Sequence, residues 1–341
     1  MARVLVAMSG GVDSSVAAAL ARDAGHEIAG VTLKLWGGAQ DSGCCSVSDV
    51  EDARRVAAQL GIDHYVWNLT EAFEAHVVQP YVDAYASGAT PNPCIECNRT
   101  MKWGALLDRA LALGFDSIVT GHHARVVETT DGLRIGRGAD PDKDQSYVLG
   151  ILDAAQVART MLPIGSMTKA DVRARAEALG FRTASKPDSQ DVCFVAGSDR
   201  AVFLGPRIER RPGRFVDRAG NDRGAHPGVD AFTIGQRKGL GVALGERTFV
   251  VDIDARTATV TLGSRADLLV GSQPCTQICW VGTTIAPDDS VTVQVRAHGG
   301  TATARVGEGF VAWSKPQPRV APGQSLVFYA DEVVIGSAIA V

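Results

Sequence analysis

The pattern of hydrophobic and polar positions changes character part-way along the chain. In the first half, short runs rich in Val, Leu and Ile alternate with longer segments whose apolar residues recur at helical spacing. The apolar runs predict strands at residues 3–8, 27–35, 64–68 and 117–120. The helical spacing predicts helices at residues 14–24, 48–60, 71–86, 99–113 and 168–179. This alternation predicts an α/β unit with a doubly wound parallel sheet, whose ligands bind at the carboxyl ends of the strands.

Beyond Asp199 the helical periodicity nearly disappears, and short β-rich runs are separated by Gly, Pro and Asp turns. The runs lie at residues 215–216, 249–253, 257–262, 291–295, 302–306, 325–329 and 332–335. We expect three domains: the α/β unit over residues 1–198, a small β-rich linking domain over 199–273, and an antiparallel β-barrel over 274–341.

The strongest local signal follows the first predicted strand. The apolar run ends at Ser9, Gly10 and Gly11, where glycine permits a tight turn with positive φ. The Ala-rich segment that follows predicts a helix capped by Asp13 or Ser14. A strand, a Gly-rich turn and a helix N-terminus together present backbone N–H groups to an anion. The pattern predicts a phosphate cradle, although it lacks the Lys that a Walker A loop requires.

Composition narrows the class of protein. With 341 residues the chain is long enough for two or three domains, and 45% hydrophobic content is ordinary for a globular protein. No apolar run reaches membrane-spanning length and no signal peptide is evident, so we expect a cytoplasmic protein with no membrane partner. The seven cysteines lack a secretory context, which favours reduced thiols with a chemical role. A net charge of −4 argues against wholesale wrapping of nucleic acid but permits a local basic face.

Three cysteines lie in polar, Pro-containing segments. Residues 90–98 predict a rigid loop ahead of a helix, which would place Cys97 near a helix N-terminus, where the helix dipole favours a reactive thiolate. Cys193 follows later in the chain. These thiols are open to three interpretations: buried core residues, a zinc or iron–sulfur site built from Cys94, Cys97 and Cys193, or a redox pair that exchanges sulfur. The remaining cysteines are expected to be bystanders: Cys44 and Cys45 in a polar loop, Cys275 and Cys279 in the β-rich region.

Seven short motifs stand in this order along the chain: SGGVDSS, TPNPCIECN, TGHHA, KDQSYVL, KPDSQDVCF, GQRKGLG and APGQSLVFY. The first resembles the pyrophosphate loop of N-type ATP pyrophosphatases, which split ATP between its α- and β-phosphates. Together the seven resemble the bacterial tRNA-uridine 2-sulfurtransferases, also called tRNA-specific 2-thiouridylases, over nearly the whole chain. The resemblance implies thiolation of the wobble uridine in the Lys, Glu and Gln tRNAs, with ATP and Mg²⁺ as cofactors. It also implies a sulfur donor, either a cysteine desulfurase or a relay of carrier proteins.

Carried over position by position, the resemblance implies roles for individual residues. The implied ATP contacts are Ala7, Met8, Ser9, Gly10, Gly11, Val12, Asp13, Ser14, Leu33 and Gly121. Cys97 is implied as the nucleophile and Cys193 as the persulfide carrier, with a Cys97–Cys193 disulfide as the spent state. The implied tRNA contacts are Asn92, Pro93 and Cys94 at the target base, with His122, Lys143, Asp144, Gln145, Arg296 and Gln324 elsewhere.

One position departs from part of the family. Cys94 stands where some members have an Asp that is proposed as an acid or base. Proton transfer is therefore open between Glu96, Asp188 and Asp191, and the iron–sulfur interpretation of the three cysteines stays open as well. Asp13 is likewise open to two roles, as a Mg²⁺ ligand or as a helix cap.

The chain also has a basic segment, and two other functions compete. Residues 200–223 carry seven arginines against three acidic residues, which suits either several RNA phosphate contacts or a solvated surface. Another adenylating ligase of the pyrophosphate-loop class is the enzymatic rival, and it needs no paired thiols. A non-catalytic nucleotide- and RNA-binding protein is the rival from a different class, which the intact loop and the two cysteines disfavour.

Overall fold

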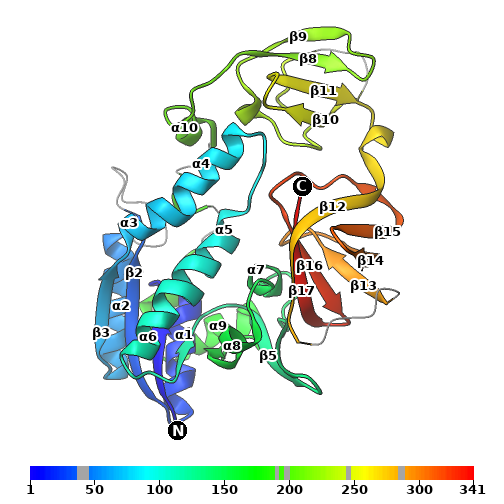
Figure 1. Ribbon diagram of the computed structural model, residues 1–341. Helices are drawn as coiled ribbons and strands as arrows, with labels where there is room; N and C mark the ends of the chain where they lie inside the picture. Colours follow the sequence, from blue (N-terminus) through cyan, green and yellow to red (C-terminus); the bar gives the residue numbers. More distant parts are fainter. Residues whose placement is uncertain (37–45, 189–191, 196–199, 243–246, 283–288) are drawn as a thin grey trace.

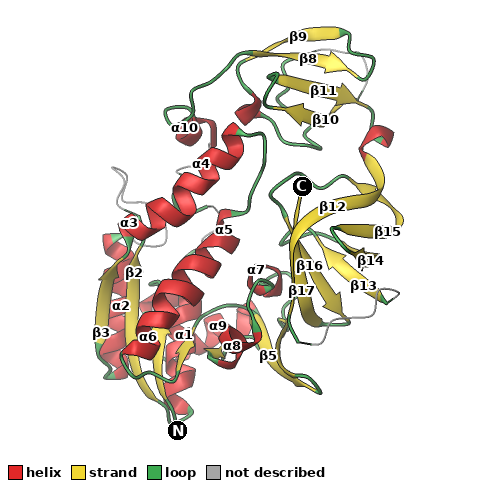
Figure 2. Ribbon diagram, in the orientation of Figure 1, coloured by secondary structure: helices red, strands yellow, loops and turns green. Residues whose placement is uncertain are grey.

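The computed structural model describes residues 1–36, 46–188, 192–195, 200–242, 247–282 and 289–341, so Cys44, Cys45 and Asp191 lie outside the described residues. Figure 1 shows three units: a helix-flanked sheet that holds the N-terminus, a small sheet at the opposite end, and a barrel that holds the C-terminus. Figure 2 shows helices concentrated in the first unit and strands in the other two. Of the helices described, none is both long and apolar enough to cross a membrane.

Five parallel strands form the first sheet, in the order β3-β2-β1-β4-β7. They are β1 (Arg3–Ala7), β2 (Glu27–Lys34), β3 (His64–Asn68), β4 (Ser117–Val119) and β7 (Thr160–Met161). From β1 the chain adds β2 and β3 on one side of the sheet, and it then crosses over to add β4 and β7 on the other side. This order confirms the doubly wound prediction. The carboxyl ends of β1 and β4 therefore meet at the topological switch point, where such sheets bind ligands.

Each face of this sheet has its own hydrophobic core, because alternate residues of β1 point to opposite sides. On one face, Val4 and Val6 are fully buried against three helices. These helices are α1 (Val12–Asp23), α2 (Val47–Leu60) and α9 (Lys169–Ala178). On the other face, Leu5 lies in a larger core with Phe73 and Trp103.

Two long helical segments cover that second face, and each contains a π-helical stretch. The first comprises α3 (Thr70–Phe73), η1 (Glu74–Val78) and α4 (Gln79–Ala86). The second comprises α5 (Pro93–Glu96), η2 (Cys97–Leu106) and α6 (Leu107–Ala112). It begins at Pro93 rather than near Arg99, because proline suits the first helical position and Asn92 caps the helix. The prediction of a loop through residue 98 is therefore wrong, and Cys97 lies in the second turn of a helix.

The middle unit is a four-stranded sheet in the order β10-β11-β8-β9. Its strands are β8 (Gly213–Asp217), β9 (Asp222–His226), β10 (Phe249–Asp254) and β11 (Thr259–Gly263). Phe215, Val250 and Val260 are the centre of its core, which confirms the expected small β-rich unit. Short helices flank it: α10 (Arg200–Leu204), η5 (Val229–Ala231) and η6 (Ala266–Leu268).

Six antiparallel strands form the C-terminal barrel, which closes where β12 pairs with β17 and confirms the predicted architecture. They are β12 (Leu269–Trp280), β13 (Ser290–Gln294), β14 (Thr301–Gly307), β15 (Phe310–Pro318), β16 (Ser325–Ala330) and β17 (Val333–Ala340). A hairpin of the first unit, β5 (Ala124–Thr129) and β6 (Gly132–Arg137), was not predicted and extends this sheet, with Gly136 paired to Val333. The remaining helices of the first unit are α7 (Ser146–Leu149), α8 (Ala154–Ala158) and η3 (Arg182–Ser185).

Candidate functional site: a phosphate loop and two thiol segments

The phosphate loop, residues 9–11, joins β1 to α1 and depends on its glycines. Gly10 has φ of +73°, and a Cβ there would lie 2.1 Å from a backbone oxygen of α2. Gly11 is the extended N-cap of α1, and no side chain caps the helix. The prediction that Asp13 or Ser14 caps it is wrong, because the helix has already begun before either residue. The first-turn N–H groups are thus left as donors for an anion.

The end of β4 lies directly against this loop. A Cβ on Gly121 would lie 2.6 Å from the backbone nitrogen of Ser14. The Ser14 hydroxyl accepts a hydrogen bond from the Ser9 N–H at 3.1 Å, which closes the turn. The structure therefore brings the predicted ATP contacts from Ala7 to Ser14 together with Gly121 at the switch point. Leu33, the other predicted contact, is buried in the core near the end of β2.

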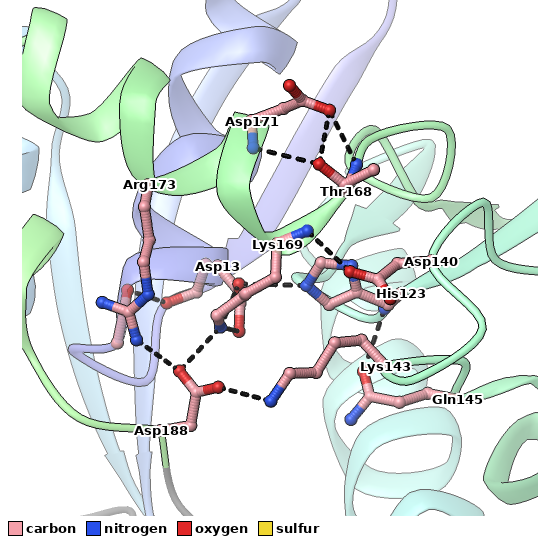
Figure 3. Close-up of polar contacts among 12 residues, drawn as sticks. Asp13, His123, Asp140, Lys143, Gln145, Thr168, Lys169, Asp171, Arg173 and Asp188 are labelled. Atoms are coloured by element: carbon pink, nitrogen blue, oxygen red, sulfur yellow. Dashed lines mark hydrogen bonds and ion pairs between the residues drawn. The ribbon is translucent and has the colours of Figure 1, made fainter.

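Asp13, in the first turn of α1, begins an ionic network beside the loop (Figure 3). Lys169 Nζ lies 2.7 and 2.8 Å from its two oxygens, and His123 Nε2 lies 3.1 Å from Oδ1. Burial alone would raise the pKa of Asp13, but the hydrogen bonds with His123 and Lys169 outweigh burial and hold the pKa below its ordinary value. The carboxylate is ionised at neutral pH and is held by Lys169 and His123 rather than acting as a helix cap.

Asp188 continues this network and gathers three cations (Figure 3). Its oxygens lie 2.9 Å from Lys169 Nζ, 2.7 Å from Lys143 Nζ and 2.7 Å from Arg173 Nη2. Burial favours a higher pKa, but hydrogen bonds from Lys143 and Lys169 lower the pKa of Asp188 to about 2. A carboxyl this acidic is a poor proton acceptor near neutral pH, so Asp188 is unsuited to the proton-transfer role that the sequence left open.

Lys186 anchors the other side of the loop, and the sequence did not suggest it. Its Nζ donates to the Gly10 carbonyl at 3.0 Å and pairs with Asp49 at 2.5 Å and Asp52 at 2.9 Å on α2. Burial would lower the pKa of Lys186, but the hydrogen bonds to Asp49 and Asp52 raise it. Lys186 and Asp188 thus fasten one segment to both sides of the loop. Both stand in the KPDSQDVCF motif, but the partners of Lys186 are 134 to 176 residues away, beyond the reach of any local pattern.

Cys94 and Cys97 lie on the first two turns of the helix that starts with α5. The Asn92 side chain accepts a hydrogen bond from the Cys94 N–H at 3.0 Å and caps this helix. Cys94 is exposed and Cys97 is half-buried. Glu96, between them, pairs with Arg99 at 3.4 Å. A proton-transfer role for Glu96 stays a prediction.

Cys97 and Cys193 pack against the same hydrophobic core on the second face of the parallel sheet. Phe194 anchors the second thiol segment, because its ring lies 5.7 Å from the Phe73 ring inside that core. No disulfide joins the two residues in the described part of the chain, where both are thiols. Across the same part of the chain, no three His, Cys, Asp or Glu side chains come together to hold a metal ion. Cys94, Cys97 and Cys193 therefore do not form the ligand set of the iron–sulfur alternative in this structure.

His122 is buried beside this core. Its Nε2 lies 3.2 Å from Lys102 Nζ, its Nδ1 lies 2.8 Å from the Thr120 hydroxyl, and the Trp103 ring lies 5.5 Å away. Burial, with the Lys102 charge as a second cause, holds the pKa of His122 well below its ordinary value. A neutral imidazole that accepts from Lys102 must carry its proton on Nδ1 and donate to Thr120. A tRNA contact by this buried ring stays a prediction.

Family models match three consecutive parts of the chain: a tRNA methyl transferase HUP domain over residues 2–197, a tRNA methyl transferase PRC-barrel domain over 201–264, and an aminomethyltransferase beta-barrel domain over 274–340. The tRNA-specific 2-thiouridylase MnmA of Corynebacterium glutamicum is 46% identical over 358 residues, with 98% of each chain covered. The protein of the same name from Mycolicibacterium smegmatis is 47% identical over 359 residues, with 99% of each chain covered. The chain belongs to the tRNA-specific 2-thiouridylase family.

Two of the domain descriptions name a methyltransferase, whereas the full-length relatives are named thiouridylases. Identity along the entire chain outweighs descriptions that each match one part, and it agrees with the family that the motifs indicated. A 4-thiouridine synthetase in complex with RNA and ATP is similar over 57% of this chain and 45% of its own, with 18% identity and a TM-score of 0.39. This TM-score is too low to support any argument about the present chain.

Within this thiouridylase-family chain, the predicted tRNA residues 143–145 have internal partners. Lys143 pairs with the Asp188 carboxylate already described. Asp144 is buried and accepts from Arg137 Nη1 at 2.9 Å. The Gln145 side chain accepts from the His123 N–H at 2.9 Å. These contacts give the segment a structural role, and its contact with tRNA stays a prediction.

The other predicted tRNA residues are more dispersed. Asn92 is a helix cap, and Pro93 is the buried first residue of α5. Arg296 is exposed beyond the end of β13, in the barrel. The Gln324 side chain donates to the Thr90 carbonyl, which links the barrel to the segment ahead of α5. The structure thus brings Gln324 close to the Asn92 segment, whereas Arg296 is not shown in contact with it.

The seven arginines of residues 200–223 are held mostly by neighbours within the chain. Four form ion pairs: Arg210–Asp230, Arg214–Asp222, Arg218–Asp267 and Arg223–Asp217. The others stack on rings or donate to a carbonyl: Arg200 on Tyr85, Arg207 on Phe203, and Arg211 to Arg256. Nearby carboxylates offset much of the positive charge, which favours the interpretation of this segment as an ion-paired surface.

Proposed function

We propose that this chain catalyses ATP-dependent 2-thiolation of the wobble uridine in the Lys, Glu and Gln tRNAs, and that it acts in the cytoplasm. One observation carries the proposal: the phosphate loop lies in the same unit as two thiols, Cys97 and Cys193, that pack against one hydrophobic core. Membership of the thiouridylase family supports the reaction class.

The first step activates the uridine. The C2 carbonyl oxygen attacks the α-phosphorus of ATP, the bond to the β-phosphate breaks, and pyrophosphate leaves. Donors fixed around Gly10 and Gly11, with the Lys169 ammonium beside them, stabilise the charge on the departing group. In this structure the Asp13 carboxylate is occupied by Lys169 and His123. Mg²⁺ belongs to the substrate, as the counter-ion of the ATP phosphates.

The second step transfers sulfur. A sulfur donor, either a cysteine desulfurase or a carrier protein, first loads Cys193 as a persulfide. Its terminal sulfur attacks C2 of the adenylated uridine, and AMP leaves. The Cys97 thiolate then attacks Cys193 Sγ, so that the S–S bond breaks and its electron pair stays on the sulfur bound to C2. The products are 2-thiouridine and a Cys97–Cys193 disulfide, which an external thiol reduces before the next turnover.

The test separates adenylation from sulfur transfer. The purified full chain is incubated with tRNA, ATP, Mg²⁺ and a persulfide donor, and 2-thiouridine is measured by retardation in a mercury-containing gel. Cys97→Ser and Cys193→Ser should each abolish the product but retain tRNA-dependent exchange of pyrophosphate into ATP. Cys279→Ser, at an exposed thiol of β12, should behave as wild type. Normal thiolation by either of the first two variants would refute the proposed sulfur route.

The iron–sulfur alternative has its own test. Iron and acid-labile sulfide are assayed in the chain after anaerobic purification. The proposed route requires full thiolation by a preparation without a cluster. A stoichiometric cluster that is needed for activity would overturn the persulfide route while leaving the product unchanged.

A further inference from the structure

Thr90 is hydrogen-bonded by both of the other units. Its N–H donates to the Pro322 carbonyl at 2.7 Å, and its own carbonyl accepts from the Gln324 side chain, so the barrel holds both of its backbone groups. Its hydroxyl lies 3.3 Å from the Thr233 hydroxyl of the middle unit. Thr90 is also buried. One residue of the first unit is therefore fixed from two sides by elements 143 and 234 residues further along the chain.

The barrel side of this contact is firmly built. The loop that carries Pro322 and Gln324 is tied to the end of β17, because the Gly323 N–H donates to the Ala340 carbonyl and the Ala340 N–H donates to the Gln324 carbonyl. Gly323 has φ of +86°, and a Cβ there would lie 3.2 Å from the nitrogen of Pro91. The loop around Gly323 is therefore in close contact with Pro91, in the segment ahead of α5.

The middle-unit side is also anchored, and it adjoins exposed positive charge. The Thr233 N–H donates to the Gln236 side chain at 3.0 Å. Gln236 is tied in turn to β10, since its carbonyl accepts from the Val250 N–H at 2.9 Å. Arg237 and Lys238 follow directly and are exposed. An RNA phosphate bound by Arg237 and Lys238 would shift the turn whose Gln236 side chain holds Thr233.

The segment beyond Thr90 has little conformational freedom. Pro91 and Pro93 fix two of its φ angles, and Asn92 caps the helix through the Cys94 N–H. A shift of Thr90 is therefore carried into the first turns of the helix, where Cys94 and Cys97 lie.

We propose that Thr90 is a positioning residue, through which the middle unit and the barrel set the orientation of the segment from Asn92 to Cys97. The inference rests on the proposed function, and on the contacts with the target base that the family resemblance implies for Asn92, Pro93 and Cys94. A misplacement of about 1 Å at a reacting group costs on the order of a hundredfold in rate, so modest slack at Thr90 is enough to slow sulfur transfer.

The experiment uses the full chain and two variants from different units. Thr90→Val removes the hydroxyl at nearly constant volume, and Gln324→Leu removes the donor to the Thr90 carbonyl. Each should lower kcat for thiolation at saturating tRNA and ATP roughly tenfold. The unfolding midpoint of both variants, and the tRNA dissociation constant of Thr90→Val, should stay close to wild type. Thr90→Ser should restore kcat, and Thr303→Val, at an exposed barrel position, is the matched control.

A second measurement keeps the inference independent of activity. The rate at which Cys97 is alkylated, followed by mass spectrometry, should change on tRNA binding in wild type but not in Thr90→Val. If wild type forms no 2-thiouridine but still shows this tRNA response, the proposed function fails while the positioning role stands. Unchanged kcat in both variants, or a wild-type tRNA response of Cys97 in Thr90→Val, would overturn the positioning role.

Discussion

The ammonium of Lys169 lies 2.7 and 2.8 Å from the two carboxylate oxygens of Asp13, although 156 residues separate them in the chain. This pair joins the first residue of α9 to the first turn of α1 (Figure 3). It fixes a cation next to the phosphate loop and leaves it largely shielded from solvent. An anion that enters the loop therefore meets both helix N–H donors and a preplaced positive charge.

Replacement of this cation should weaken nucleotide binding. Lys169→Gln removes the charge and keeps much of the side-chain length. We expect at least a roughly tenfold loss of ATP affinity, because a charge-assisted hydrogen bond contributes about 1.5–3 kcal/mol. Isothermal titration with ATP checks it, with Lys315→Gln in the barrel as the exposed-lysine control. Equal affinity in the two variants would contradict a role for Lys169 at the loop.

The glycine requirement of the loop can be separated from the general cost of positive φ. Gly10→Ala places a Cβ 2.1 Å from the Asp49 backbone oxygen, whereas Gly25→Ala, at φ of +81°, places one in open space. The Gly25 variant should lose only about 1 kcal/mol of unfolding free energy. The Gly10 variant should lose more and should also fail to bind ATP. Urea unfolding and ATP titration measure the two effects, and similar losses in both variants would refute the close-approach argument.

The Asp188 carboxylate should contribute acid-sensitive stability. Its pKa is about 2 in the folded chain, below the ordinary value of 3.8, so the unfolded chain binds the proton more tightly. The stabilisation is present above about pH 4 and is lost as the pH falls towards 2. With allowance for solvent screening it is worth about 1 kcal/mol. Urea unfolding at pH 5 and pH 2.5 should show a smaller pH dependence for Asp188→Asn than for wild type, and identical slopes would argue against this assignment.

Arg137 should be a stability residue at the junction with the barrel. Its guanidinium lies 4.0 Å from the Tyr329 ring centroid and donates to Asp144 and to Gln294, each at 2.9 Å. Arg137→Met should cost about 3 kcal/mol, since it leaves the buried Asp144 carboxylate without its cation. Urea unfolding measures the loss, with the highly exposed Arg256→Met as the control. A loss below about 0.5 kcal/mol would show that the other donors to Asp144 suffice.

Four strands of the parallel sheet were predictable because each lies in a local run of apolar residues, whereas the two-residue β7 (Thr160–Met161) was not predicted. β1 is the clearest example, since Val4, Leu5 and Val6 are all fully buried. The β5–β6 hairpin was missed because polar residues interrupt its short apolar runs; its strands pair with each other, and β6 meets the barrel at Gly136 and Val333. The start of α5 was misplaced because Pro93 fits both a rigid loop and a first helical position, and only the Asn92 cap distinguishes them.

The candidate site shows the same difference between features that depend on neighbouring residues and features that depend on distant ones. The turn at Gly10 and Gly11 is encoded within a few residues, so the sequence located it. The anchors Lys169 and Lys186 were not found, because a lysine in a surface-like pattern gives no sign of a distant carboxylate partner. The cap expected from Asp13 was wrong because α1 already begins at Val12, with Gly11 as its N-cap.

Because Gly136 of the first unit pairs with Val333 of the barrel, the barrel is not a unit that can be transferred on its own to another protein. A barrel excised at its apparent start would leave behind β6, and the start of β17 at Val333 would lose its partner in that strand. A chimaera that grafts this barrel onto another enzyme would need residues 124–137 as well, although they lie well over a hundred positions upstream in the gene product.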